Sequence, residues 1–357
     1  MINMFSPLAF RRGKPMSNRF MLAPLTNTQS HDDGVLSDDE FTWLTMRAKG
    51  GFGAVMTCAA HVSATGQGFP GQLGIFDDKH LPGLSRLAAA IGETGALSLV
   101  QLQHAGNRAP AELIGEAPMC PSDDGRGARE MTADDVAGTI EDFIAAAVRA
   151  EAAGFDGVEL HGAHGYLICE FLSPELNRRT DSYGGSPENR ARYLYEILAG
   201  VRERCSDNFI VGIRLSPERF GLELGEIVKL SESLLVDDRV DFLDVSLWDC
   251  FKEPEDEAFK GRLLADYFTE LERGDTKLGF AGKLNQPSDI DRVMAMGIDF
   301  ALLGRAAIIH HNYPQLYAED FVAETPPVSP RHLAAEGVSA QFIKYLGNFP
   351  GFVSEPV

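Results

Sequence analysis

Eight short apolar runs, each followed by a segment with helical features, constrain the fold of this chain more than any other feature. The runs lie at residues 20–24, 53–60, 96–102, 157–161, 209–215, 241–247, 277–281 and 300–303. This alternation implies parallel strands joined by right-handed crossovers. Eight such units in 357 residues favour an α/β fold, the closed (β/α)8 TIM barrel, over an open sheet. No G-x-G-x-x-G motif follows the first run, which weakens the case for a dinucleotide-binding domain.

The segments outside the barrel are short. Residues 5–19 predict an N-terminal cover of two brief extended pieces, with a turn between them. A proline-rich stretch at 326–330 separates the barrel, about residues 20–320, from a tail at 326–357. The tail carries four aromatic residues that a free arm would not need, namely Phe342, Tyr345, Phe349 and Phe352. We therefore expect a single domain over residues 1–357, with the tail packed on the barrel or on a second subunit of a homo-oligomer.

Helix boundaries are marked by local signals. Ser37 precedes three acidic residues that suit the first turn of a helix, and that helix should run to about residue 49. Ser186-Pro187-Glu188 combines a cap, a proline at the first helical position and an acid. Further helices are expected at residues 82–93, 132–153, 167–172, 187–204 and 226–236, before Arg273, after Pro287 and at the barrel's end.

Charge and cysteine usage limit the partners. The net charge is −20, so a nucleic acid or an anionic membrane surface is not an expected partner. The five cysteines are widely spaced and form no C-x-x-C pair, which argues against a disulfide framework, a zinc site and an iron–sulfur cluster. No apolar run is long enough to span a bilayer, and the N-terminus lacks a signal-peptide core. The sequence thus favours a cytoplasmic enzyme without a metal.

The end of the run at 157–161 gathers polar chemistry. His161, His164 and Tyr166 lie within six residues, where a strand becomes a loop, and α/β folds place their sites at such points. A packed barrel end with satisfied hydrogen bonds is the plainer alternative. A metal is less favoured because no ligand spacing such as H-E-x-x-H is present. Two neutral imidazoles suit donation to a developing oxyanion, and a tyrosine of pKa about 10 can supply a proton. This combination fits reduction of a double bond conjugated to a carbonyl.

Other polar residues end the remaining strands. Thr26, Gln101 and Arg214 follow or close three of the apolar runs. Gly282 follows the seventh, and Gly304-Arg305 follows the eighth, where TIM barrels commonly bind phosphate. Two ordinary glycine turns, with Arg305 paired to a surface acid, would explain the last two sites equally well. Arg214 lies in an apolar strand and needs a partner, such as an anionic ligand, an electron-rich ring or Glu159.

These residues belong to a series of motifs that resembles the Old Yellow Enzyme family of FMN-dependent NAD(P)H oxidoreductases. The matching stretches include QLQHAG at 101–106, HGAHGYL at 161–167, YGGSPENR at 183–190, and residues 18–20, 23–24, 153–159, 171–174, 177–181 and 303–305. Each stretch is weak alone, but their order and spacing over almost the whole chain are specific. The resemblance implies a barrel with non-covalent FMN across its strand ends.

The resemblance also implies roles for individual residues. The flavin would be lined or held by Pro24, Leu25, Thr26, Ala59, Gln101, Arg214, Gly282, Gly304 and Arg305, the last three at its phosphate. Thr26 would tune the flavin potential through a hydrogen bond. His161 and His164 would bind an oxyanion, and Tyr166 would donate the proton. The implied mechanism is ping-pong: NAD(P)H reduces FMN and leaves, and a small-molecule acceptor then takes the hydride.

The chain departs from the family pattern at two positions. Thr28 stands where one bacterial branch has a substrate-binding tyrosine, and Asn107 is an extra residue before Arg108. Both departures alter the pocket wall, so the acceptor does not follow from the resemblance. Alternatives are flavin-dependent amine demethylation on the same scaffold, a flavin-free barrel lyase or isomerase that binds a phosphate, and a non-enzymatic flavin-binding protein.

Overall fold

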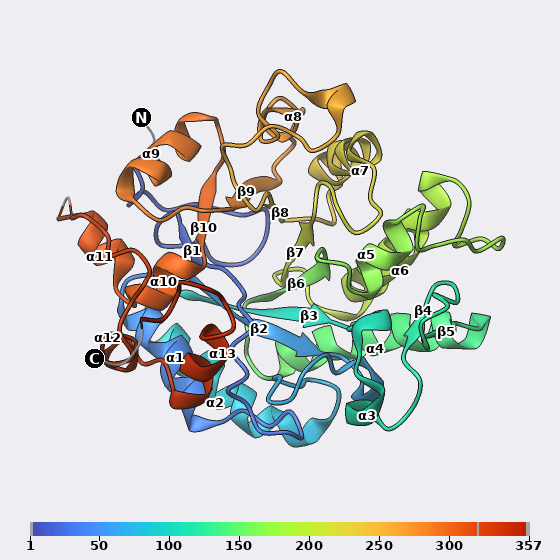
Figure 1. The fold of residues 1–357 in the computed structure, drawn as a ribbon, viewed down its shortest axis with the longest axis horizontal. Helices are drawn as coiled ribbons and strands as arrows, with labels where there is room; N and C mark the ends of the chain where they lie inside the picture. The colour runs from blue at the N-terminus through green and yellow to red at the C-terminus, as the bar shows by residue number, and fades with distance from the viewer. Residues whose placement is uncertain (1–2, 320, 355–357) are drawn as a thin grey trace.

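The computed structural model describes residues 3–319 and 321–354, which form a closed barrel of eight parallel strands surrounded by helices (Figure 1). The barrel order is β1-β10-β9-β8-β7-β6-β3-β2. These strands are β1 (Phe20–Leu22), β2 (Ala54–His61), β3 (Leu97–Gln103), β6 (Gly157–Gly162), β7 (Ile210–Leu215), β8 (Phe242–Ser246), β9 (Lys277–Ala281) and β10 (Phe300–Leu303). The predicted (β/α)8 TIM barrel is therefore confirmed.

Helices connect the strands on the outside of the barrel. The long ones are α1 (Asp38–Lys49), α2 (Leu81–Gly92), α4 (Ala133–Ala152), α6 (Pro187–Arg204), α7 (Leu224–Val236) and α9 (Pro287–Ala295). The shorter ones are α3 (Ala111–Ile114), α5 (Leu167–Leu172), α8 (Asp266–Thr269), α10 (Arg305–Ile309), α11 (Tyr313–Tyr317), α12 (Pro330–Ala335) and α13 (Ala340–Leu346). The predicted caps are present: the side chains of Ser37 and Ser186 accept from the backbone N–H of Glu40 and Asn189.

Two sequence expectations need correction. The helix expected to end near Arg273 is the single turn α8, because its charged sequence offers little apolar surface and only Phe268 is buried. Residues 107–131, for which the sequence predicts neither a helix nor a strand, contain α3 and a two-stranded parallel sheet, β4 (Met119–Cys120) with β5 (Arg129–Glu130). Strands of two residues leave too short a pattern to read from sequence.

Strand register brings polar residues together at one end of the barrel. Gln101 of β3 is paired with Glu159 of β6, His161 of β6 with Arg214 of β7, and Arg214 with Asp244 of β8. Polar side chains from four consecutive strands therefore meet in one region. The carboxyl end of a barrel is where such residues form a site.

The amino end of the barrel is closed by the N-terminal cover. Leu8 and Met16 form an antiparallel bridge, which confirms the two extended pieces expected from the sequence. Leu8, Phe10 and Met16 pack in one cluster with barrel residues that include Phe242 and Phe300. Among the residues that the structure describes, this apolar packing covers the amino end of the barrel, whereas the polar strand ends lie at the carboxyl end.

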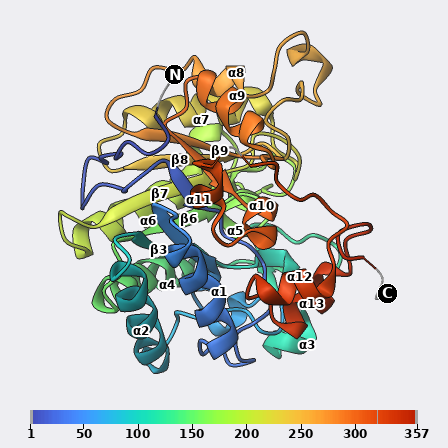
Figure 2. The same ribbon diagram turned by 90° about the vertical axis from the view of Figure 1, so that its left-hand side faces the viewer.

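The C-terminal tail packs on the barrel of its own chain beside α1 (Figure 2). The rings of Phe342 and Trp43 of α1 lie edge to face with centroids 5.2 Å apart, and Phe342 is fully buried. Val328 and Val353 form a bridge that folds the tail back on itself. The part of the tail at residues 355–357 lies outside the described residues. In the rest of the chain, none of the described helices has the length and apolar content to cross a membrane.

Candidate active site

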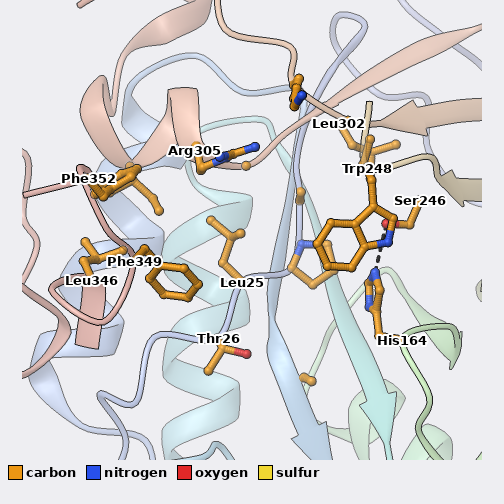
Figure 3. A pocket seen from close by; sticks show the side chains of 18 of the residues that line it. Leu25, Thr26, His164, Ser246, Trp248, Leu302, Arg305, Leu346, Phe349 and Phe352 are labelled. Carbon is orange, nitrogen blue, oxygen red and sulfur yellow. Dashed lines mark hydrogen bonds between the residues drawn. The ribbon is translucent and has the colours of Figure 1, made fainter. Parts of the chain in front are cut away.

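A cavity of about 670 Å³ opens at the carboxyl ends of the strands, a volume typical of small-molecule sites (Figure 3). It is lined by every residue predicted to act in catalysis or to hold the flavin, namely Pro24, Leu25, Thr26, Ala59, Gln101, His161, His164, Tyr166, Arg214, Gly282, Gly304 and Arg305. The closed barrel thus brings together residues up to 281 positions apart in the sequence. Their placement in one cavity was expected, while their roles remain predictions.

The two histidines form a hydrogen-bonded pair. Nε2 of His161 lies 2.9 Å from Nδ1 of His164, and Nε2 of His164 lies 2.9 Å from the hydroxyl oxygen of Ser246. His164 has a φ of 62°, which is uncommon for a residue with a Cβ. Its backbone N–H donates to the Ser216 hydroxyl at 3.0 Å, which helps to hold this conformation. The backbone therefore turns the second imidazole back over the first.

Burial keeps both imidazoles neutral. Desolvation lowers the pKa of His164 to about 3, with further lowering by the charges of Arg214 and Arg108. Desolvation also lowers the pKa of His161 well below its usual value, as do His164 and Arg214. Tyr166 lies beside the pair, with its ring centroid 5.1 Å from that of His161. Burial raises the pKa of Tyr166, so its phenol holds a proton at neutral pH.

Nitrogen NMR on histidine-labelled protein tests the charge of the pair. We expect the His161 and His164 signals to stay those of neutral imidazole from pH 8 down to pH 5, because a lowered pKa keeps a base unprotonated. The variants His161→Asn and His164→Asn assign the signals. A signal that disappears in either variant, and that titrates in wild-type protein near pH 6.5, would contradict the expectation.

Arg214 lies in a buried cluster of charged groups. Its Nε is 2.9 Å from a carboxylate oxygen of Asp244, and both side chains are buried. Glu159, which was one of the possible partners expected from the sequence, instead accepts a hydrogen bond from the Gln101 amide at 2.7 Å. Burial raises the pKa of Glu159, and the charge of Asp244 raises it further. Glu159 is thus the acid of the cluster that favours its neutral form, while the carboxylate of Asp244 neutralises the charge of Arg214.

The opposite part of the cavity has features that suit a phosphate. Gly304 precedes α10, and Arg305 is exposed and points into the cavity (Figure 3). A Cβ added at Gly282 would lie 3.0 Å from the backbone of Trp248 and Asp249, so the close approach of the loops after β8 and β9 favours glycine at this position. Small residues beside a cation leave backbone groups accessible to an anion.

These residues fit FMN. Arg305 and the two glycines could hold the phosphate of FMN. Gln101 and Arg214 are buried at strand ends and could hydrogen-bond to the polar edge of the flavin ring. Nδ1 of His161, a residue that lines the cavity, is buried without a hydrogen-bond partner among the described residues, which leaves one polar atom for a ligand. In those same residues, no cluster of three or more potential ligands could hold a metal ion.

Sequence reasoning missed several residues of the cavity. Ser246 lines the cavity from β8, and Asp244 of the same strand pairs with the lining residue Arg214. A polar residue in an otherwise apolar run was the available signal for both. Trp248, Arg219 and Phe220 come from loops after β8 and β7, whose conformation no local pattern predicts. The tail supplies Phe342, Tyr345, Leu346, Phe349 and Phe352. Figure 3 shows Leu346, Phe349 and Phe352 across the cavity from His164 and Trp248.

Comparison with known proteins identifies the family. The family model described as "NADH:flavin oxidoreductase / NADH oxidase family" matches residues 3–320. The Bacillus subtilis (strain 168) protein named "Probable NADH-dependent flavin oxidoreductase YqiG" is 36% identical over 322 residues, which are 87% of this chain and 86% of the relative. The match disfavours the flavin-free lyase and the non-enzymatic alternatives.

Solved structures agree with this assignment. A morphinone reductase in complex with tetrahydroNAD has a TM-score of 0.79 and 28% identity over 93% of this chain and 94% of that one. A 2-naphthoyl-CoA reductase in complex with 2-naphthoyl-CoA has a TM-score of 0.80 and 30% identity over 89% of this chain, which spans about half (52%) of that longer protein. The resemblance to the Old Yellow Enzyme family is thus confirmed. The chain belongs to the NADH:flavin oxidoreductase / NADH oxidase family, as an FMN-dependent NAD(P)H oxidoreductase.

Proposed function

We propose that this enzyme reduces an alkene conjugated to a carbonyl group, with His161 and His164 binding the carbonyl oxygen and Tyr166 donating the proton. The observation that carries the proposal is the neutral histidine pair beside a protonated phenol in the cavity. When bound, FMN accepts a hydride from NAD(P)H and delivers it to the acceptor. The protein must then bind the oxygen and supply one proton.

The histidines suit the first task. Each neutral imidazole carries one N–H donor and avoids the cost of a buried charge. The contact between the rings and the contact of His164 with Ser246 hold the two rings in place, and a bound carbonyl oxygen would replace these partners as the acceptor of the N–H groups. Preorganised donors stabilise negative charge that develops on the carbonyl oxygen. Tyr166 suits the second task, because its phenol stays protonated and lies next to the pair.

The proposed placement of the flavin follows from the cavity's lining. Pro24, Leu25, Thr26 and Ala59 would contact its ring, with the Thr26 hydroxyl tuning the potential by a hydrogen bond. Gln101 and Arg214 would bind the polar edge of the ring. Gly282, Gly304 and Arg305 would hold the phosphate. We further propose a single cytoplasmic domain without a nucleic-acid partner, since a net charge of −20 repels polyanions.

Anaerobic half-reactions test the function. Purified enzyme with FMN should lose its flavin absorbance on addition of NADH or NADPH. Addition of a conjugated enone should then restore the absorbance, with the saturated ketone as product. A candidate amine should leave the oxidised flavin unchanged. Reduction by the amine, together with no reoxidation by any enone, would overturn the proposal in favour of amine oxidation.

A further inference from the structure

Among the residues that the structure describes, the charged ones that line the active-site cavity are all cationic, although the chain carries a net charge of −20. They are Arg108, Arg214, Arg219, Lys283 and Arg305, and no described aspartate or glutamate joins them in the lining. A cavity whose charged groups all have the same sign and whose walls are otherwise apolar concentrates the electrostatic field, and positive charges there attract anions. FMN contributes one phosphate, so the number of cations exceeds what that group needs.

Carboxylates outside the cavity balance three of these cations. Arg214 pairs with Asp244, Arg219 with Glu255, and Lys283 with Asp249. Among the residues that the structure describes, Arg108 and Arg305 form no ion pair. Arg305 lies beside Gly304, where the flavin phosphate is proposed to bind. Arg108 is therefore the cavity cation that has no carboxylate at ion-pair distance among those residues and no proposed contact with the flavin phosphate. Its charge acts on the buried carboxyl group of Glu170, but burial raises the pKa of that group and favours its neutral form.

The position of Arg108 places its charge beside the proton donor. The guanidinium carbon lies 5.3 Å from the centroid of the Tyr166 ring and 6.0 Å from that of Phe220. One of its N–H groups donates to the carbonyl oxygen of His164. Arginine on aromatic faces keeps a defined orientation while its remaining N–H groups stay available. The charge is thus fixed at the side of the cavity where the acceptor is reduced.

The surrounding backbone is shaped to keep this arrangement. A Cβ at Gly165 would lie 2.9 Å from the Phe220 ring and 3.5 Å from a guanidinium nitrogen of Arg108, so glycine leaves the space that both side chains use. Arg219 and Phe220 have φ values of 70° and 55°, and residues with a Cβ rarely adopt this conformation. Backbone in such conformations is found where function positions a side chain.

We propose that Arg108 binds an anionic group of the acceptor, so that the preferred substrates are activated alkenes bearing a carboxylate or phosphate. This proposal rests on the proposed function and names its substrate class. A planar guanidinium fork matches a carboxylate or phosphate through two N–H donors. An acceptor anchored there would lie next to Tyr166 and the histidine pair.

A matched pair of acceptors tests the proposal. The probes are 4-carboxybenzylideneacetone and its methyl ester, which share the alkene and differ in charge. Stopped-flow reoxidation of the NADH-reduced enzyme gives an apparent Kd for each, and calorimetric titration of the oxidised enzyme with 4-carboxyphenylbutanone or its ester gives binding without turnover. We expect the carboxylate to bind at least tenfold more tightly than the ester at low salt, with the difference shrinking as salt screens the charge.

Variants assign that difference to Arg108. Arg108→Gln should abolish the preference for the carboxylate, and Arg108→Lys should keep most of it. Arg204→Gln, which removes an exposed arginine paired with Glu141 at the end of α6, should keep it all. Equal binding of acid and ester by wild-type enzyme, or an unchanged preference in Arg108→Gln, would overturn the inference.

Two further results are distinguishable from these. Arg108→Gln could weaken binding of NADPH relative to NADH during flavin reduction and leave the ratio of the Kd values for the acid and the ester unchanged. In that case Arg108 binds the phosphate of the electron donor, and the inference about the acceptor fails. If neither enone reoxidises the reduced enzyme although both saturated ketones bind the oxidised enzyme, the proposed alkene reduction fails instead.

Discussion

Replacing Tyr166 by phenylalanine should slow reoxidation of the reduced enzyme by an enone about 10²- to 10⁴-fold, the usual contribution of a positioned general acid. The phenol is beside His161, with ring centroids 5.1 Å apart, and burial keeps it protonated. Flavin reduction by NAD(P)H needs no proton from this group, so its rate should change less than about threefold. A tenfold change in rate corresponds to about 1.4 kcal/mol in the activation free energy, so this limit is well below that value. Single-turnover stopped-flow measurements of each half-reaction give both values.

Tyr345→Phe is the matched control for this experiment. Tyr345 is a second phenol in the cavity, contributed by the tail, and burial raises its pKa. Its ring packs on Phe349, with centroids 5.4 Å apart, rather than on the histidine pair. We expect this variant to change acceptor reduction less than Tyr166→Phe does. A larger effect at Tyr345, or equal slowing of both half-reactions at Tyr166, would remove Tyr166 as the acid.

Replacing Arg214 by methionine should both destabilise the protein and release FMN. The change leaves the buried carboxylate of Asp244 without its cation, and breaking a buried pair in this way costs about 3–5 kcal/mol. Because Arg214 also lines the cavity, we expect the Kd for FMN to rise at least tenfold. Chemical denaturation of the apoprotein measures the first effect, and fluorescence titration with FMN measures the second.

Arg202→Met separates stability from cofactor binding. Arg202 pairs with the buried Asp241, which precedes β8 at the amino end of the barrel, away from the cavity. Arg12 also lies 3.2 Å from Asp241, so the carboxylate keeps one cation and the loss of stability should be smaller. The Kd for FMN should stay at the wild-type value. Equal weakening of FMN binding in both variants would mean that Arg214 acts only through the fold.

Local patterns predicted most of the barrel. The caps at Ser37 and Ser186 and the apolar runs gave helix and strand positions, because such signals depend on neighbours within a few residues. The predicted site residues all lie in one cavity, since parallel strands of a closed barrel end on the same face. For Arg214 the sequence left open an anionic ligand, an electron-rich ring and a neighbouring carboxylate such as Glu159, and in the structure the carboxylate of Asp244 forms the ion pair. Both acids lie on strands next to β7, so sequence alone could not choose between them.

The sequence by itself determined the barrel and the order of polar residues at its strand ends, because both follow from short-range periodicity and from chain order. Only the tertiary structure decided what surrounds them. It placed Arg108 against Tyr166, 58 positions later, and brought the tail's aromatic residues to the cavity opposite His164. Loop and tail conformations depend on contacts between distant segments, for which local sequence patterns carry no signal.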